Sequence, residues 1–504
     1  MKYQTIIGTL AVAFLLTSTA FAQAPDKAAA TADKAAPAVK AAPAAKKAYA
    51  LADVTAQKWT GDLDGMTQRR VIRVLVTYSK THYFVDKATQ RGLTYDMFRL
   101  FEDDLNKKLK KKNVRIHVFL IPVSRDELIP ALLEGRGDIA AANLTITPER
   151  QKQVDFTDPT RRNVSEIVVT GPGAELIATA EDLSGREVYV RKSSSYYQSL
   201  EKLNADLVKA GKKPVKVRFA PEELETEDIL EMVNAGLVKT TIIDDHIAEF
   251  WSKIFTKIAL NRDAAVRTGG DIGVMIRPNS PQLKAELNAF LARYGEGSSA
   301  RNQLLQKYLT NTKFAKESTS KEEIAKFEAT VEFFRKYGDK YELDYLLVMA
   351  QGYQESRLDQ NAKSPVGAIG VMQVMPGTGK DMNVGDITNI EPNIHAGVKY
   401  MRFMMTQFYA DEPMDNLNKG LFTFASYNAG PGRVSQLRKQ AAKRGLDPNK
   451  WFNNVEVLAA EKIGRETVQY VSNIYKYYLA YRMLIEERGD REKAKEEIKK
   501  EMGK

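Results

Sequence analysis

The stretch Leu343-Asp-Tyr-Leu-Leu-Val-Met-Ala-Gln-Gly-Tyr-Gln-Glu-Ser356 predicts a helix that is apolar on most of its surface. Such a helix is expected to be buried. It ends with Glu355, and burial at this position would disfavour the charged carboxylate and raise its pKa toward neutrality. The helix pattern alone favours a plain ion pair of Glu355 with Arg357 over a proton donor. The segments that follow change this balance in favour of the proton donor. The apolar positions at helical spacing are Leu343, Leu346, Leu347, Ala350 and Tyr353.

A glycine-rich segment follows the helix, Ser364-Pro-Val-Gly-Ala-Ile-Gly-Val-Met-Gln-Val-Met-Pro376. Its glycines allow a tight loop whose backbone approaches a bound molecule closely. The amide of Gln373 and the soft apolar surface of Met375 suit N-acetyl groups and the faces of sugar rings. Farther along, Ser426-Tyr-Asn-Ala-Gly-Pro431 places the phenol of Tyr427 before a turn, where it is expected to hydrogen-bond the acid or a substrate.

Together, the Glu-Ser, Gly-Val-Met-Gln, Ser-Tyr-Asn and Glu-Thr-x-x-Tyr-Val elements resemble the soluble-lytic-transglycosylase family, a lysozyme-like fold that acts on peptidoglycan. The resemblance covers roughly residues 325–490. Val371 stands where Leu is usual and Ser426 where Ala is common, but neither change removes a reacting group.

The resemblance implies a reaction with one catalytic carboxyl and no cofactor. Glu355 would protonate the glycosidic oxygen between N-acetylmuramic acid and N-acetylglucosamine. The same carboxylate would then take the proton of the sugar's C6 hydroxyl, which closes a 1,6-anhydro ring. Glu466 is expected to hold helices together rather than to react. The substrate-binding residues implied by the resemblance are Ser364, Gln373, Met375, Tyr427 and Asn428.

From about Arg69 the pattern changes to α/β. Strand-like runs alternate with helical ones, which predicts a mainly parallel sheet in two lobes that flank a ligand cleft. The expected strands are residues 71–77, 114–121, 138–142, 187–190, 215–219 and 240–243, and the expected helices are residues 95–109, 125–134, 195–210 and 223–235.

Within this region, Asn143-Leu-Thr-Ile-Thr-Pro-Glu-Arg150 and Val154-Asp-Phe-Thr-Asp-Pro159 resemble the periplasmic solute-binding family for amino acids. The resemblance covers about residues 69–310. It implies that Arg150, with Thr145 beside it, pairs with an α-carboxylate. Asp244 would receive the amino group, with Asp245 as the rival. An amino acid or a muropeptide is the implied ligand, and lobe closure on it is the implied regulation.

The whole chain is expected to be multidomain, with a two-lobed α/β region like a periplasmic binding protein followed by an all-α, lysozyme-like region. Residues 1–22 have the charged start, apolar stretch and small-residue cleavage site of a signal peptide. The expected segments are signal peptide 1–22, flexible Ala/Pro/Lys-rich linker 23–57, solute-binding region 58–312, linker 313–323, catalytic region 324–490 and charged tail 491–504.

Composition narrows the choice of partners. The chain has no cysteine, its four histidines form no metal-ligand pattern, and its net charge is +11. An exported protein rarely meets nucleic acid, so we expect acidic cell-wall polymers as partners, with peripheral binding to a membrane surface also compatible with the basic tether. The expected location is the periplasm, including the outer-membrane surface.

Two alternatives stay open at this point. The first is a muramidase, which uses water on the same fold. The second is a solute sensor whose inert helical region anchors it to the wall.

Overall fold

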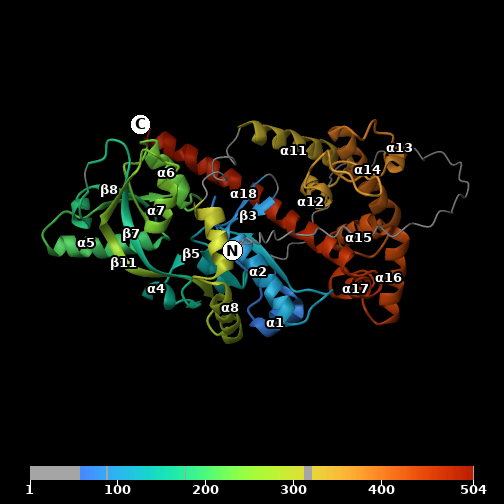
Figure 1. Ribbon diagram of the computed structural model, residues 1–504, viewed down its shortest axis with the longest axis horizontal. Coiled ribbons are helices and arrows are strands. Elements are labelled where there is room, and N and C mark those ends of the chain that lie inside the picture. The colour runs from blue at the N-terminus through green and yellow to red at the C-terminus, as the bar shows by residue number, and fades with distance from the viewer. Residues whose placement is uncertain (1–56, 87–88, 176, 311–320, 503–504) are drawn as a thin grey trace, which may run out of the picture.

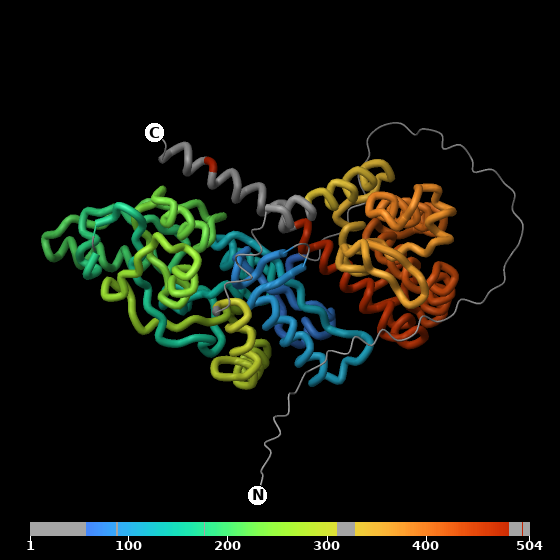
Figure 2. The backbone as a smooth tube through the Cα atoms, turned by 45° about the horizontal axis from the view of Figure 1, so that its top comes forward, coloured from blue at the N-terminus to red at the C-terminus, as the bar shows by residue number. Residues whose placement is uncertain are grey.

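The computed structural model describes residues 57–86, 89–175, 177–310 and 321–502. We call residues 57–310 the N-terminal region and residues 321–502 the C-terminal region. The first contains the β-sheet and the second is helical, and the two lie side by side (Figure 1). The blue lobe of the N-terminal region lies between its green lobe and the helical region (Figure 2).

The main sheet of the N-terminal region has the strand order β4-β1-β5-β11-β7-β10-β8-β9, and β6 pairs with β11. A separate hairpin, β2–β3, lies beside it. The strands are β1 (Val71–Val76), β2 (Phe84–Asp86), β3 (Thr89–Arg91), β4 (His117–Pro122), β5 (Ile139–Thr145), β6 (Asp155–Phe156), β7 (Arg161–Thr170), β8 (Glu187–Arg191), β9 (Lys216–Ala220), β10 (Thr240–Asp244) and β11 (Ala259–Ile276).

The prediction of a mainly parallel sheet is only partly correct. β1 pairs in parallel with β4 and β5, and β8 pairs in parallel with β9 and β10. Between these groups run the long antiparallel strands β7 and β11, which connect the lobes and which the sequence did not predict. Much of β11 is only partly buried and its register shifts repeatedly, so it lacks the apolar alternation typical of a strand.

Helices cover both lobes. The described α-helices of the N-terminal region are α1 (Leu63–Arg69), α2 (Leu93–Lys108), α3 (Leu128–Leu133), α4 (Pro148–Gln151), α5 (Ser195–Lys209), α6 (Thr226–Asn234), α7 (Asp245–Ser252), α8 (Pro281–Tyr294) and α9 (Ser299–Leu305). The four helices expected from sequence correspond to α2, α3, α5 and α6, with ends that differ by a few residues.

Within residues 321–502 the structure has helices and isolated bridges but no named strand, as expected for the helical region. Helices α13, α16 and α17 were not predicted, because each is short or polar. The α-helices are α11 (Lys321–Tyr341), α12 (Tyr345–Ser356), α13 (Pro376–Met382), α14 (Ile390–Tyr409), α15 (Asn416–Ala429), α16 (Pro431–Lys443), α17 (Glu456–Lys462) and α18 (Arg465–Met502).

Helix α18 extends from the helical region across the sheet region (Figure 1). It continues without interruption through the segment expected to be a separate charged tail. Helix α11 begins at Lys321, inside the expected linker. The expected signal peptide and all of the expected tether except Gln57 lie outside the described residues. No helix among the described residues is long and apolar enough to cross a membrane.

The two regions share a buried interface. The Arg70 guanidinium makes two bonds to the Glu456 carboxylate, with Nη1–Oε2 at 2.6 Å and Nη2–Oε1 at 2.9 Å. The rings of Phe119 on β4 and Tyr475 on α18 meet edge to face, 5.8 Å between centroids. The apolar core of the helical region therefore continues into the N-terminal region.

Candidate active site

Helix α12 holds the expected proton donor and is buried along most of its length. The Asp344 side chain caps its first turn by accepting from the Leu346 amide at 3.0 Å. Its apolar face packs at the centre of the helical region, with Val348 and Ala350 inaccessible to solvent. The helix stops after Ser356 because Arg357 and Leu358 both adopt the left-handed conformation, with φ of 60° and 63°. Glu355 therefore lies at the end of a rigid, buried element.

The Glu355 carboxyl is partly buried, and desolvation raises its pKa to about 7. The Tyr470 hydroxyl on α18 donates to Glu355 Oε1, which offsets part of this rise. Gln351, one turn earlier on α12, donates to the Tyr470 oxygen at 3.3 Å. The acid is thus oriented by a phenol that is itself held by the same helix.

Among the described residues, burial and the Tyr470 hydrogen bond are the causes of the Glu355 pKa shift, and no charged neighbour contributes. The alternative ion pair with Arg357 is not formed. The Arg357 guanidinium instead donates to the Tyr353 hydroxyl and lies over its ring, 5.1 Å from the centroid. A carboxyl with a near-neutral pKa and no cationic partner is suited to give and take a proton near pH 7.

The glycine-rich loop is closed by its own polar groups. Ser364 Oγ accepts from the Ala368 amide at 2.9 Å. The amide nitrogen of Gln373 donates to two loop carbonyls, those of Ala362 and Gly370, at 3.2 and 2.9 Å. Ser364 and Gln373 therefore shape the loop in this structure.

The remaining predicted substrate residues lie on neighbouring elements. Met375, before α13, has 43% of its surface exposed. The Tyr427 hydroxyl on α15 donates to the Met372 carbonyl at 2.8 Å, which ties α15 to the glycine loop. Proximity to Glu355 contributes to the raised pKa of Tyr427, although burial is its main cause. Asn428 is exposed and accepts from Thr467 on α18 at 2.7 Å.

Tyr470 and Gln351 were missed as site residues by the sequence analysis. Tyr427 was expected to hydrogen-bond the acid or a substrate. It donates to the Met372 carbonyl, and Tyr470 makes the hydrogen bond to the acid. The available signal was the Glu-Thr-x-x-Tyr-Val motif, whose tyrosine is Tyr470. Glu466, in the same motif, is exposed.

The predicted ligand residues of the N-terminal region lie where its two lobes meet. Arg150 donates to the Thr145 carbonyl at 2.9 Å and, across the cleft, to the Ser193 carbonyl at 3.1 Å. Asp244 accepts from Asn143 at 2.9 Å, and burial raises its pKa to about 6. The lobes thus close on each other at these positions. The rival Asp245 accepts amide hydrogens near the start of α7.

A bidentate ion pair reinforces this closure. Arg125 lies between β4 and α3 in the first lobe. Its Nε is 2.9 Å from Glu225 Oε1 at the start of α6, and its Nη2 is 3.0 Å from Glu225 Oε2. The Lys80 amide also donates to Glu227 of α6 at 2.5 Å. Protein groups therefore hold the two lobes together.

Two protein families match this chain. Residues 71–311 match the bacterial extracellular solute-binding proteins, family 3, and residues 332–450 match the transglycosylase SLT domain. Among solved structures, an ancestral amino acid-binding protein, a precursor of cyclohexadienyl dehydratase, is 24% identical with a TM-score of 0.40. That match covers 49% of this chain and 99% of the other.

Curated relatives span both regions. A protein of Desulfosudis oleivorans named membrane-bound lytic murein transglycosylase F is 28% identical over 432 residues, 82% of this chain and 90% of the relative. A protein of Pseudomonas fluorescens with the same name is 28% identical over 438 residues, 82% of this chain and 85% of the relative. The chain therefore joins a family 3 solute-binding domain to a transglycosylase SLT domain and is a homologue of proteins named membrane-bound lytic murein transglycosylase F.

Proposed function

We propose that this protein is a peptidoglycan lytic transglycosylase with Glu355 as its catalytic acid and base. The observation that carries the proposal is the environment of this carboxyl: the end of a buried helix, a pKa raised to about 7 and a hydrogen bond from the Tyr470 phenol. The SLT domain and the names of the homologous proteins support the same activity.

The chemistry follows from a carboxyl that works alone. Hydrolases with two carboxylates divide the acid and nucleophile or base roles between them. Here the protonated Glu355 gives its proton to the glycosidic oxygen as the bond to N-acetylmuramic acid breaks. The resulting carboxylate takes the C6 hydroxyl proton while that oxygen bonds to the anomeric carbon. The product is a 1,6-anhydro end, and Glu355 is protonated again.

The other predicted residues take supporting roles in this proposal. Tyr470 orients the carboxyl. Ser364 and Gln373 maintain the loop that forms one side of the sugar-binding surface, and Met375 and Asn428 offer their exposed side chains to the glycan. Tyr427 holds α15 against that loop.

Digestion of purified peptidoglycan, followed by mass spectrometry of the products, tests the proposal. We expect the wild-type protein to form anhydro-muropeptides. The Glu355→Gln variant should form them about 10²- to 10⁴-fold more slowly. Glu466→Gln is the matched control, because its carboxyl is exposed and lies in the same domain.

The products distinguish the alternatives. Reducing ends, one water heavier, would identify a muramidase. Absence of products from the folded wild-type protein would favour a sensor with an inert wall-anchoring region.

For the N-terminal domain, we propose an amino acid or muropeptide as ligand, held through Thr145, Arg150 and Asp244. The family match supports this assignment. A ligand carboxylate would replace the two carbonyls that Arg150 now contacts, so the lobes must part before binding. An upward shift of the melting temperature with free amino acids or muropeptides, lost in Arg150→Lys, tests the assignment, and no shift with any of them would refute it.

The proposed location is the periplasm, including peripheral attachment at the outer membrane. The N-terminal export pattern and the homologues named membrane-bound lytic murein transglycosylase F support a place in the cell envelope. Fractionation of cells, with and without a high-salt wash, separates a freely periplasmic protein from one bound peripherally.

A further inference from the structure

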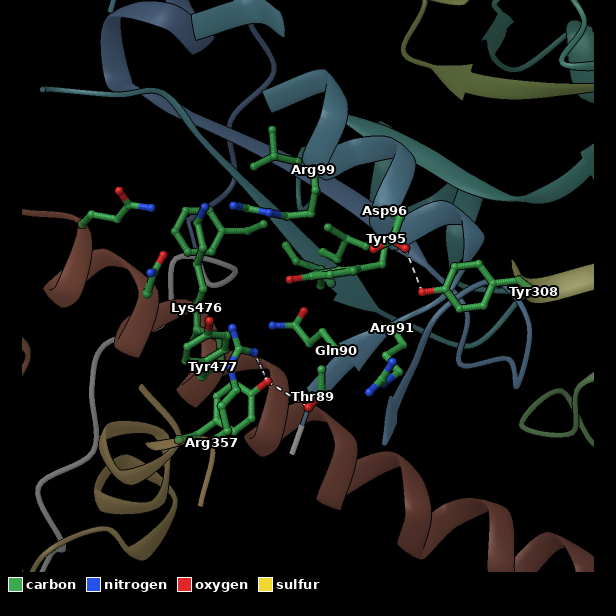
Figure 3. Close-up of a pocket in the computed structure, with 18 of the residues that line it drawn as sticks. Thr89, Gln90, Arg91, Tyr95, Asp96, Arg99, Tyr308, Arg357, Lys476 and Tyr477 are labelled. Atoms are coloured by element: carbon green, nitrogen blue, oxygen red, sulfur yellow. Dashed lines mark hydrogen bonds between the residues drawn. The ribbon is translucent and has the colours of Figure 1, made fainter. Parts of the chain in front are cut away.

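A cavity of about 530 Å³ lies between the two domains, away from the lobe–lobe cleft. Its lining comes from the β2–β3 hairpin, α2 and β4 on one side and from the end of α12 and α18 on the other. Figure 3 shows side chains from these elements around one common space. Both domains therefore build this cavity.

The lining is strongly basic. Among the described residues that line it, cations outnumber carboxylates five to one, with Asp96 as the carboxylate. The amides of Gln90, Gln469 and Asn473 and the phenols of Tyr95 and Tyr477 add polar groups. The cationic side chains are Arg91, Arg99, Lys307, Arg357 and Lys476.

Four of these cations already have carboxylate neighbours. Lys307 lies 2.9 Å from Asp96, and Arg91 lies 3.2 Å from Asp86. Arg99 and Lys476 share the buried Glu102, at 3.1 and 2.7 Å. The three carboxylates together balance three of these four charges, which leaves an excess of positive charge even before Arg357 is counted.

Arg357 has no carboxylate partner in the part of the chain that the structure describes. The backbone of Arg357 has the left-handed conformation, and so does that of the next residue, Leu358. Consecutive left-handed non-glycine residues are uncommon and cluster at functional sites. This backbone turns the Arg357 side chain toward Tyr353, whose hydroxyl donates to Thr89 on the hairpin at 2.8 Å. An unpaired guanidinium is thus held at the domain boundary.

We propose that this interdomain cavity binds a small anion with two or more carboxylate or phosphate groups. Arg357 from the SLT domain and Arg91 from the solute-binding domain supply the guanidinium groups, which match either kind of oxyanion. The volume falls in the range of sites for small molecules. A univalent anion would leave positive charge on one side unpaired, so multivalent anions are favoured.

The site is distinct from the predicted amino-acid cleft, and the proposal does not depend on the catalytic activity. The cavity is nevertheless connected to Glu355 through the two helices that carry the acid and its phenol partner. Tyr353 stands two residues before Glu355 on α12, and Gln469 directly precedes Tyr470 on α18. An anion that bridges the domains would therefore restrain both residues of the acid–phenol pair through their own helices.

Calorimetric titration of the full protein with citrate and with pyrophosphate, at constant ionic strength, tests the proposal. We expect saturable binding of at least one, weakened about tenfold or more in both Arg357→Gln and Arg91→Gln. Tighter binding of citrate would assign carboxylates to the ligand, and tighter binding of pyrophosphate would assign phosphates.

Arg218→Gln is the matched control, because this arginine is exposed in the far lobe and pairs with Glu187. It is expected to bind like the wild type. Because the two variants lie on opposite sides of the cavity, the test still holds if one of them misfolds. Melting temperatures equal to that of the wild type, measured without anion, would verify that each variant is folded. Absence of saturable binding to the wild type, or equal affinity of wild type and both folded variants, would overturn the proposal.

Discussion

Two carboxyls whose pKa is raised by desolvation, one in each domain, differ in what surrounds them. Glu355 in the SLT domain and Asp244 in the solute-binding domain both have a pKa raised by desolvation, to about 7 and about 6. Glu355 remains partly accessible and accepts a hydrogen bond from the Tyr470 phenol. Asp244 is 1% exposed, accepts from Asn143 and lies near His246, which acts to lower the Asp244 pKa.

The two domains differ in whether their ionisable side chains are engaged by other protein groups. In the SLT domain, the acid lies at a helix end, and no cation among the described residues contributes to its pKa. In the solute-binding domain, charged side chains bind other groups of the same domain. Arg150 donates to two backbone carbonyls, and Arg125 forms an ion pair with Glu225 across the lobes. Similar pKa shifts therefore accompany the proposed proton transfer in one domain and the contact between the lobes in the other.

The largest expected effect comes from breaking the lobe–lobe ion pair with Arg125→Gln. This removes the bidentate Arg125 partner of Glu225, whose side chain is 5% exposed. Removal of one partner of a buried pair costs about 3–5 kcal/mol, and we expect a loss of this size in the unfolding free energy of the solute-binding domain by urea titration. Arg218→Gln, whose pair with Glu187 is exposed, should cost less than about 1 kcal/mol. Equal costs would show that the cleft pair does not hold the lobes.

A second prediction concerns stability against pH. The folded-state pKa of Glu355 is raised, so the folded protein resists ionisation between about pH 4.5 and pH 7 while the unfolded chain ionises. Stability is lost as the pH rises through this window. Glu355→Gln should therefore be more stable than wild type by roughly 1–3 kcal/mol at pH 8 and equal to it near pH 4.

Urea titrations at both pH values measure this gain. Glu466→Gln, at an exposed position in the same helical C-terminal region, is the control and should show no such gain. A stability difference for Glu355→Gln that does not change with pH would contradict the assigned cause.

The same contrast governs what the sequence could predict. Helix α12 and its acid were predictable because a continuous apolar run ends in one carboxyl. The contact between Glu355 and Tyr470 was not, because it joins positions 115 residues apart. Likewise, β11 carries polar residues on an incompletely buried strand, and the closure of Arg150 onto Ser193 depends on how the lobes meet. Local pattern identifies elements and reactive residue types, whereas pairing between distant elements needs the fold.

Removal of the phenol partner sharpens the account of the acid. Tyr470→Phe deletes the hydrogen bond that lowers the Glu355 pKa, so that pKa should rise further. The alkaline limb of the pH–rate profile should move to higher pH, and the rate at pH 6 should fall about tenfold because the carboxyl is less well oriented. Tyr478→Phe is a matched control on α18, since its hydroxyl also donates to a carboxylate, Asp344, at 2.8 Å. An unmoved alkaline limb in Tyr470→Phe would show that another group governs it.

The smallest expected effect tests the open side of the SLT domain. Met375 has 43% of its surface exposed, so Met375→Ala should change the unfolding free energy by less than about 0.5 kcal/mol. If its side chain contacts the glycan equally in ground and transition states, KM for soluble glycan strands should rise roughly threefold while kcat stays unchanged. Val208→Ala, at an exposed position on α5, removes a comparable apolar surface in the other domain and should change neither constant. A fall in kcat with constant KM would instead mean that Met375 contributes only as the bond breaks, which would extend the reacting site from Glu355 to the start of α13.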